Sequence, residues 1–153
     1  GRGVLGEEVG AAWNALCRVE DRSRLWGYDW GKDYDGRPID EYFLSVAQED
    51  FRRRRCVNFA VRLGEACIGE AVLYNPDWRG GMELGCRIAP EYAGHGYGRE
   101  AFAAAAEWAL YGLGLARVVA KCFKENAASC KMLDFSMRKT GEDENYFYFE
   151  KTI

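Results

Sequence analysis

The chain has 153 residues, of which 48% are hydrophobic, so we expect one domain with a buried core over residues 1–153. A net charge of −3 argues against a nucleic-acid-binding protein, because such proteins draw affinity from cationic contacts with phosphates. No apolar run reaches the roughly 18 residues of a membrane helix and no secretory signal is visible. We therefore expect no membrane contact and a cytoplasmic location.

The cysteines and the single histidine bear on metal binding. The cysteines are scattered without the close pairing of zinc ligands, and His95 is the only histidine, so we expect no metal site. Several cysteines have apolar neighbours in strand-like segments, which is typical of reduced, buried thiols in a cytosolic protein. They are Cys17, Cys56, Cys67, Cys86, Cys122 and Cys130.

The N-terminal third is predicted to be helical. Residues 7–19 place apolar side chains on one helical face, and residues 38–54 have a similar pattern. The loop at residues 29–36 between them is acidic and aromatic, which suits a cationic amine but is equally typical of a solvated loop. The four arginines at residues 52–55 fit the end of the second helix, where cations complement the helix dipole.

The rest of the chain alternates strands with helices. The first two strands are expected to form a hairpin about a turn at residues 64–66. The element order predicts an α/β domain with a mixed sheet. Predicted strands cover residues 56–63, 67–74, 84–89, 117–123 and 145–153, and predicted helices cover residues 101–110 and 126–136.

A glycine-rich turn joins the third predicted strand to the helix that follows it. Gly94, Gly96 and Gly98 alternate in this turn. Glycine tolerates positive φ and lets the backbone approach a ligand closely, and the N–H groups at a helix start attract anions. The arrangement therefore predicts a phosphate or pyrophosphate site.

Three kinds of ligand compete for this turn. A nucleoside triphosphate loop requires lysine and then serine or threonine after its last glycine, whereas Arg99 and Glu100 stand here. A dinucleotide site requires an acidic residue at the end of the next strand, and residues 121–124 supply none. The pyrophosphate of coenzyme A is the remaining interpretation.

Residues 82–141 resemble the GNAT superfamily of N-acetyltransferases, and they are most similar to the branch that includes ribosomal-protein N-terminal acetyltransferases. Several motifs stand in register, which makes the resemblance specific. The matching segments are Glu83–Pro90, Ala93–Gly98, Leu113–Val118, Glu125–Ser129 and Arg138–Glu142.

The resemblance implies an α/β (α+β) fold with a mixed, mainly antiparallel sheet, splayed central strands and flanking helices. The chain also departs from the family pattern. Ala93 stands where arginine or glutamine is usual, which predicts weaker affinity for coenzyme A, and residues 134–137 lack a glycine that commonly follows the helix before them. Of the strand that usually precedes the first helix, only Val4 and Leu5 are candidates, so we expect this strand to be lacking.

The reaction implied by the resemblance is direct transfer of acetyl from acetyl-CoA to a primary amine, without a metal. The acceptor is a small molecule or a peptide: a peptide N-terminus, an amino acid, a polyamine or an amine antibiotic. Two alternatives stay open, namely a non-catalytic acyl-CoA sensor on the same scaffold and an NAD-dependent oxidoreductase. A homodimer formed through the final aromatic strand is compatible with the sequence, but no motif supports it.

The resemblance also assigns residues to roles. Glu83 is the candidate base, acting through water, and Ser129 could hydrogen-bond the leaving thiolate. The backbone at Arg87 and Ile88 is expected to pair with pantetheine. The full set of cofactor-binding candidates is Arg87, Ile88, Gly94, His95, Gly96, Tyr97, Gly98, Arg99 and Asn126.

Each catalytic candidate has a plainer interpretation. Glu83 could be a solvent-facing strand residue, Ser129 an ordinary first-turn serine and Asn126 a helix N-cap. We expect the His95 side chain to be exposed rather than catalytic, and Tyr111 to pack in the core rather than donate a proton. Cysteines 86 and 130 flank the predicted site but lack a histidine partner, so packing is the better interpretation for both.

Overall fold

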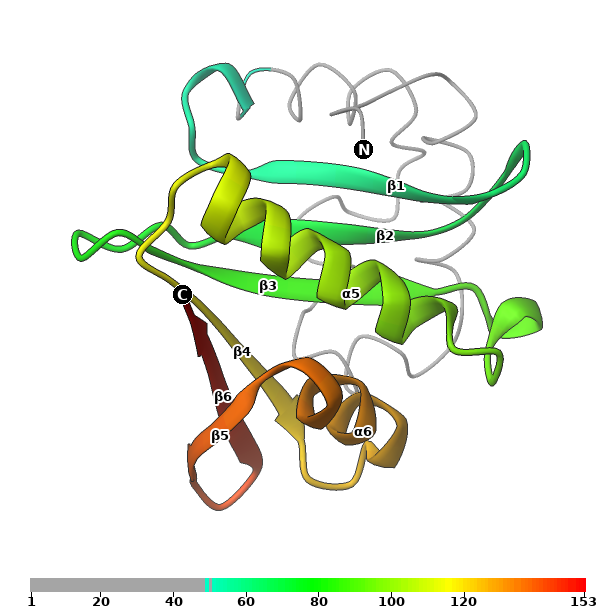
Figure 1. Ribbon diagram of the computed structural model, residues 1–153. Helices are drawn as coiled ribbons and strands as arrows, with labels where there is room; N and C mark the ends of the chain where they lie inside the picture. Colours follow the sequence, from blue (N-terminus) through cyan, green and yellow to red (C-terminus); the bar gives the residue numbers. More distant parts are fainter. Residues whose placement is uncertain (1–48, 50) are drawn as a thin grey trace, which may run out of the picture.

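The computed structural model describes residue 49 and residues 51–153. The helix predicted at residues 7–19 and the loop at residues 29–36 lie outside this part, as does most of the helix at 38–54. In the described part, six strands form one sheet with two α-helices (Figure 1). The elements are β1 (Val57–Leu63), β2 (Ala66–Tyr74), β3 (Gly81–Ile88), the 3-10 turn η1 (Pro90–Tyr92), α5 (Tyr97–Glu107), the π-helical turn η2 (Trp108–Gly112), β4 (Arg117–Phe123), α6 (Ala127–Ser136), β5 (Arg138–Glu142) and β6 (Tyr146–Thr152).

The sheet has the order β1-β2-β3-β4-β6-β5. Every neighbouring pair is antiparallel except β3 and β4, which are parallel and pair only through Gly81–Glu83 and Arg117–Val119. Beyond these residues the two central strands diverge, and the opening between them, called here the V, widens toward the start of α5 (Figure 1). This confirms the expected mixed, mainly antiparallel sheet with splayed central strands.

The strand predictions hold with one shift and one omission. β1 and β2 form the predicted hairpin about Gly64, and β4, α6 and β6 lie where the sequence placed them. β3 begins at Gly81, three residues before its predicted start. The strand Arg138–Glu142 was implied only by the family resemblance, because its polar sequence has no apolar alternation.

Helix α5 is longer at its start than predicted. It begins at Tyr97, four residues before the expected position, because Gly98 is taken into its first turn. Its C-terminal end continues as the π-helical turn η2, where Leu113 donates its N–H to the carbonyl of Trp108 at 2.9 Å. A side chain at Gly112 would meet the Trp108 ring, so glycine ends this turn without a clash.

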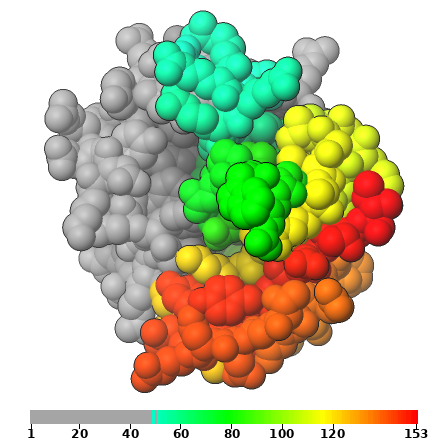
Figure 2. Space-filling model, turned by 90° about the vertical axis from the view of Figure 1, so that its left-hand side faces the viewer, coloured from blue at the N-terminus to red at the C-terminus, as the bar shows by residue number. Residues whose placement is uncertain are grey.

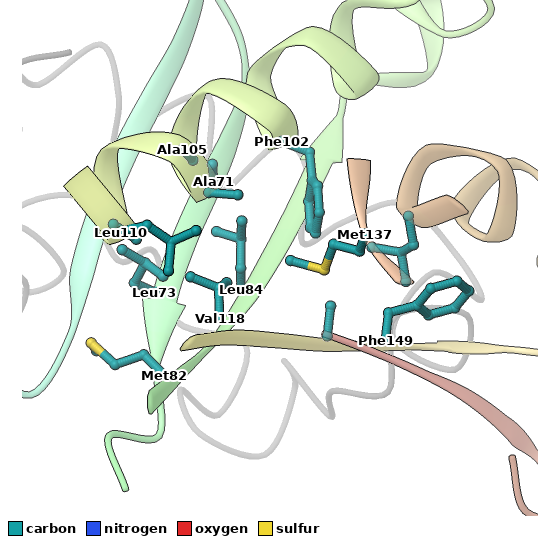
Figure 3. Packing of buried hydrophobic residues seen from close by; sticks show 14 of the residues in the cluster. Ala71, Leu73, Met82, Leu84, Phe102, Ala105, Leu110, Val118, Met137 and Phe149 are labelled. Atoms are coloured by element: carbon teal, nitrogen blue, oxygen red, sulfur yellow. The ribbon is translucent and has the colours of Figure 1, made fainter. Parts of the chain in front are cut away.

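The core lies between the helices and one face of the sheet. α5 runs across β2 and β3, and α6 lies beside β4 (Figure 1). Phe102 of α5 is fully buried, and it shares the core with Leu84 of β3, Val118 of β4 and Phe149 of β6 (Figure 3). Burial of a large apolar side chain of this kind contributes about 1.5–3 kcal/mol. Because residues from both arms of the V belong to one core, packing fixes the angle between the arms.

The β2–β3 loop holds the closed end of the V. Asp77 Oδ1 accepts from the N–H groups of Arg79 and Gly81 at 2.7 and 2.9 Å, and Asp77 Oδ2 accepts from Arg117 Nη2 at 2.8 Å. The loop projects at the centre of Figure 2, beside the residues that lead into β4 and the end of β6. The hydrogen bond from Arg117 is the main cause that lowers the pKa of Asp77 from 3.8 to about 2. The hydrogen bonds from the two backbone N–H groups and the charge of Arg117 act in the same direction.

Replacing Asp77 with asparagine is expected to destabilise the protein near neutral pH and to matter less in acid. A carboxylate whose pKa is lowered by folding stabilises the folded state when the pH is above the pKa of the unfolded state. This contribution is lost as the pH falls from 3.8 toward 2. Urea unfolding of the wild type and Asp77→Asn between pH 2 and pH 7 measures the difference. A difference that stays constant or widens in acid would contradict this assignment.

Several smaller expectations can be compared with the structure. Helical backbone is present at residues 49, 51 and 52, and Arg52 and Arg53 both form ion pairs with Glu49, at 2.5 Å. In the described part of the chain, the five cysteines are free thiols and no cluster of side chains could hold a metal ion. Within the same residues, no helix is long and apolar enough to cross a membrane.

Candidate active site

The inner edge of β3 faces the V with unused backbone groups. Ala89 donates its N–H to Ile68 of β2 at 2.7 Å, and backbone groups alternate between the two edges of a strand. Leu84, Cys86 and Ile88 therefore direct their N–H and C=O groups toward β4, and beyond the last paired residue, Glu83, the groups of Cys86 and Ile88 face the V. Of the two residues predicted to pair with pantetheine, Ile88 lies on this edge. Arg87 belongs to the edge that pairs with β2.

The side chain of Arg87 lies away from the V. Its Nε is 2.6 Å from Glu70 Oε1 of β2, and both side chains are buried. The pair lies on the sheet face opposite α5, because the flanking residues of β3 face that helix. Arg87 is therefore part of the wall of the sheet and does not point toward the glycine turn.

The glycine turn lies at the open end of the V. Gly94 and Gly96 both have φ of 82°, a conformation that residues with side chains rarely adopt, and Gly96 is the N-cap of α5. A Cβ at Gly98 would lie 3.3 Å from Ile88 of β3 and 3.4 Å from Met132 of α6. The first turn of α5 therefore packs closely against both arms, and its free N–H groups face the position where an anion binds at a helix start.

Three larger side chains accompany the turn. His95 is exposed, as predicted, and its ring centroid lies 5.5 Å from that of Tyr97. The exposed guanidinium of Arg99 lies 4.5 Å from the Phe135 ring of α6. Arg99 is thus a cation in the first turn of α5 and adds positive charge beside the helix start.

Glu83 lies at the apex of the V, as the last residue of β3 that pairs with β4. Its neighbours in the strand, Met82 and Leu84, face the core, so Glu83 lies on the opposite face. Glu83 Oε2 accepts a hydrogen bond from the Tyr74 hydroxyl, and Asn75 Nδ2 lies 3.5 Å from Glu83 Oε1. The carboxylate is therefore positioned by side chains of β2 and the loop after it.

The pKa of Glu83 is raised above the usual 4.5, chiefly because burial disfavours the charged form. The charge of Lys121 and the hydrogen bond from Asn75 oppose this effect. A carboxylate with a raised pKa is a better proton acceptor than an ordinary surface glutamate.

A second group of polar side chains lies across the V on the same face. In β4 and β6, Lys121 pairs with Tyr148, and Phe123 pairs with Tyr146. The rings of Phe123 and Tyr146 stack with centroids 4.5 Å apart. The Tyr148 hydroxyl donates to Asp143, and this hydrogen bond is the main cause of the raised pKa of Tyr148.

Asn126 and Ser129 belong to the start of α6. Asn126 is the N-cap, and its Oδ1 accepts the N–H of Ser129 at 3.2 Å. The predicted N-cap is therefore present, and it fixes the first turn of α6 beside the end of β4. Ser129 is half-buried in this turn.

The remaining candidates are the cysteines and Tyr111. Burial, followed by the charge of Glu70, raises the pKa of Cys86 to about 12, and its thiol donates to the Gly98 carbonyl at 3.8 Å. The Sγ atoms of Cys122 and Cys130 lie 3.0 Å apart, and burial raises the pKa of Cys122 to about 12. A thiol with a pKa this high, as at Cys86 and Cys122, is not a nucleophile at neutral pH, in agreement with the packing role expected for Cys86. Tyr111 was expected to pack in the core, but it is 68% exposed at the far end of the helix from the glycine turn.

The sequence analysis missed the partners of Glu83 and the group across the V. Tyr74 could have been found from the hairpin pattern, because extending the β2–β3 register places it opposite Glu83. Lys121 was read only as a strand residue. Its proximity to Glu83 depends on the parallel pairing of β3 with β4, which local sequence does not reveal.

Comparison with protein families identifies the chain. Residues 8–134 match the model of the acetyltransferase (GNAT) domain. The chain belongs to the GNAT acetyltransferase family. This confirms the resemblance found in the sequence, and it makes the protein an acetyltransferase that takes acetyl-CoA as its cosubstrate and an amine as its acceptor. The comparison with curated protein sequences gives no match.

Solved structures share the GNAT fold at low sequence identity. Ribosomal-protein-S5-alanine acetyltransferase from Vibrio fischeri has a TM-score of 0.80 at 21% identity, covering 95% of this chain and 87% of its own. RimJ from Mycobacterium smegmatis, solved with CoA-disulfide, has a TM-score of 0.78 at 20% identity, covering 97% and 79%. Spermidine N-acetyltransferase from Vibrio cholerae, solved with CoA and spermine, also has a TM-score of 0.78, at 14% identity, covering 97% and 92%.

Proposed function

We propose that this GNAT domain transfers acetyl from acetyl-CoA directly to a primary amine, with Glu83 as the base. The observation that carries the proposal is the position of Glu83 at the apex of the V, in line with the free edge of β3 and the glycine turn. Phosphate-binding and proton-accepting groups thus lie at opposite ends of one opening.

The cosubstrate side of the proposal uses backbone groups. The N–H groups of the turn at residues 94–98 would hold the pyrophosphate at the start of α5, with Arg99 nearby. Pantetheine would lie in the V and pair with the N–H and C=O groups of Cys86 and Ile88, as an added strand does. Ser129 and Asn126 border this path from α6, with Ser129 proposed as a hydrogen-bond donor to the leaving thiolate.

The acceptor side uses Glu83. An ammonium group is not a nucleophile, so Glu83 takes a proton from the amine, directly or through water. The amine nitrogen then attacks the thioester carbonyl, the carbon–nitrogen bond forms, and the carbon–sulfur bond breaks. The thiolate leaves and is protonated. The hydrogen bond from Tyr74 holds Glu83 in place while the amine approaches.

A thermal-shift titration with acetyl-CoA, CoA, NAD and ATP tests the cosubstrate. A ligand that binds only the folded state raises the melting temperature by mass action. We expect acetyl-CoA and CoA to raise it and NAD and ATP to leave it unchanged. A rise with NAD instead would contradict the assignment of the glycine turn.

Release of free thiol from acetyl-CoA, followed with a panel of primary amines, tests the reaction. At least one amine is expected to accelerate the release above the rate without acceptor. A protein that binds acetyl-CoA but releases no thiol with any amine would be an acyl-CoA sensor, and the proposed function would be wrong.

A further inference from the structure

The acceptor site proposed above has charges of opposite sign on its two sides. Glu83 lies at the end of the paired part of β3, next to Val119 of β4. Lys121 is two residues further along β4 on the same face, at the point where the strands have begun to diverge. The two side chains therefore lie on the same face at the narrow end of the V, with the carboxylate on one arm and the ammonium on the other.

These two groups do not neutralise each other by direct contact. Among the described residues, no carboxylate lies within 4.0 Å of the Lys121 ammonium, and Glu83 forms no ion pair. The charge of Lys121 nevertheless acts on the titration of Glu83, so the two are close enough to interact. Lys121 is exposed and Glu83 is half-buried, so a small ligand can reach both.

Among the described residues, the charged side chains that neighbour Glu83 and Lys121 on this face are paired. Arg87 is bound to Glu70, and Arg117 contacts both Asp77 and Glu150. Arg138 of β5 also contacts Glu150, and Asp143, between β5 and β6, accepts from the Tyr148 hydroxyl. Of the charged strand residues described here, Glu83 and Lys121 are thus two opposite charges without an ion pair.

The stacked rings of Phe123 and Tyr146, called here the aromatic wall, already contact a cation. The Lys121 ammonium lies 5.0 Å from the centroid of the Tyr146 ring. A ring in this position could bind a second ammonium group of a polyamine, but Lys121 occupies it and repels another cation. The cation–π contact also holds the lysine on this wall, where it can bind an anionic group.

We propose that the acceptor is a zwitterion of the α-amino-acid class, with its amine at Glu83 and its carboxylate at Lys121. The inference rests on the proposed function, because it names the substrate class of the same site. The carboxylate forms a charge-assisted hydrogen bond with Lys121, and the amine nitrogen is directed toward the thioester. Glu83 takes one proton from the ammonium group, the nitrogen then forms the carbon–nitrogen bond of an N-acetyl amino acid as the carbon–sulfur bond breaks, and the second proton lost from nitrogen protonates the leaving thiolate.

Thiol release with matched acceptors tests this inference. The acceptors are α-amino acids, the corresponding amino-acid amides, which lack the carboxylate, and spermidine. We expect the wild type to use amino acids and to use their amides and spermidine less well. Lys121→Gln should lower kcat/KM for amino acids about tenfold while changing the values for amides little, since a hydrogen bond to a charged group is lost.

Three variants separate recognition from a general effect. Lys121→Arg should keep the preference for the carboxylate, and Lys121→Glu should shift it toward spermidine. Lys131→Gln removes an exposed lysine of α6 and is the matched control, with no change expected. Comparing amino acid with amide within each variant cancels differences in stability and in cosubstrate binding.

The outcomes distinguish the two proposals. A wild type that uses spermidine or amides better than amino acids would overturn the zwitterion inference alone, as would an equal loss for acid and amide in Lys121→Gln. Absence of thiol release with every acceptor would overturn the proposed function and this inference together.

Discussion

Replacing Glu83 with glutamine is expected to lower kcat by about 10²–10⁴-fold and to leave affinity for acetyl-CoA unchanged. General-base catalysis contributes a factor of this size, and glutamine keeps the shape of the side chain but cannot accept a proton. The amide can still accept the hydrogen bond from Tyr74, so the site should stay in place. Steady-state thiol release gives kcat, and the thermal shift with CoA gives binding.

The pH dependence provides a second readout for the same variant. Because burial raises the pKa of Glu83, the acidic limb of the wild-type kcat/KM profile should lie above pH 4.5. Glu83→Gln should lose this limb. Glu107→Gln makes the same chemical change at an exposed position of α5 and should keep the limb and the rate. Full activity in Glu83→Gln would assign the base elsewhere.

Stability does not account for such a loss. A carboxyl group whose folded pKa lies above its unfolded value costs stability once the pH exceeds the folded pKa. Removing the ionisable group at Glu83 should therefore leave the melting temperature at neutral pH unchanged or higher. A lower kcat in a protein at least as stable as the wild type would be an effect on the chemistry.

Replacing Gly96 with valine is expected to abolish the thermal shift produced by CoA. Gly96 is the N-cap of α5 with φ of 82°, and a β-branched residue avoids this conformation at a cost of about 1–2 kcal/mol. Relieving the strain turns the N–H groups of the turn away from the pyrophosphate. The side chain also places bulk where the phosphate must approach the backbone.

Gly64→Val separates the loss of binding from the strain itself. Gly64 has φ of 61° in the β1–β2 turn, and nothing lies within 4 Å of the Cβ that it would gain. The same is true of Gly94, which precedes Gly96 in the glycine turn. We expect both valine variants to have lowered melting temperatures, while only Gly96→Val loses the response to CoA. A normal CoA response in Gly96→Val would show that the pyrophosphate binds elsewhere.

Local signals predicted much of the fold and part of the site. Period-two alternation placed the β1–β2 hairpin, and a capping asparagine at residue 126 placed the start of α6. Both depend on residues close in sequence. The glycine turn was likewise found from local sequence, because glycine is the residue that tolerates the positive φ of such a turn.

The missed features depend on strand pairing across the fold. β5 has no apolar alternation because its strand is mostly exposed at the edge of the sheet. Arg87 was assigned to the cofactor because the sequence placed it in β3. The sequence did not reveal that its backbone groups belong to the edge that pairs with β2. Lys121 lies near Glu83 only because three residues of β3 pair in parallel with β4. Long-range register, rather than residue type, decides all three.

The short parallel pairing of β3 and β4 has a consequence for association between molecules. An open strand edge is normally a place where another chain can add a strand and start aggregation. Here the open groups of Cys86 and Ile88 lie inside the sheet, facing β4 across the V, which narrows to three paired residues. A strand of another molecule would need to insert between β3 and β4, into the V, to pair with these groups. The protein can therefore keep unpaired backbone groups ready for a narrow ligand without offering a template to its own copies.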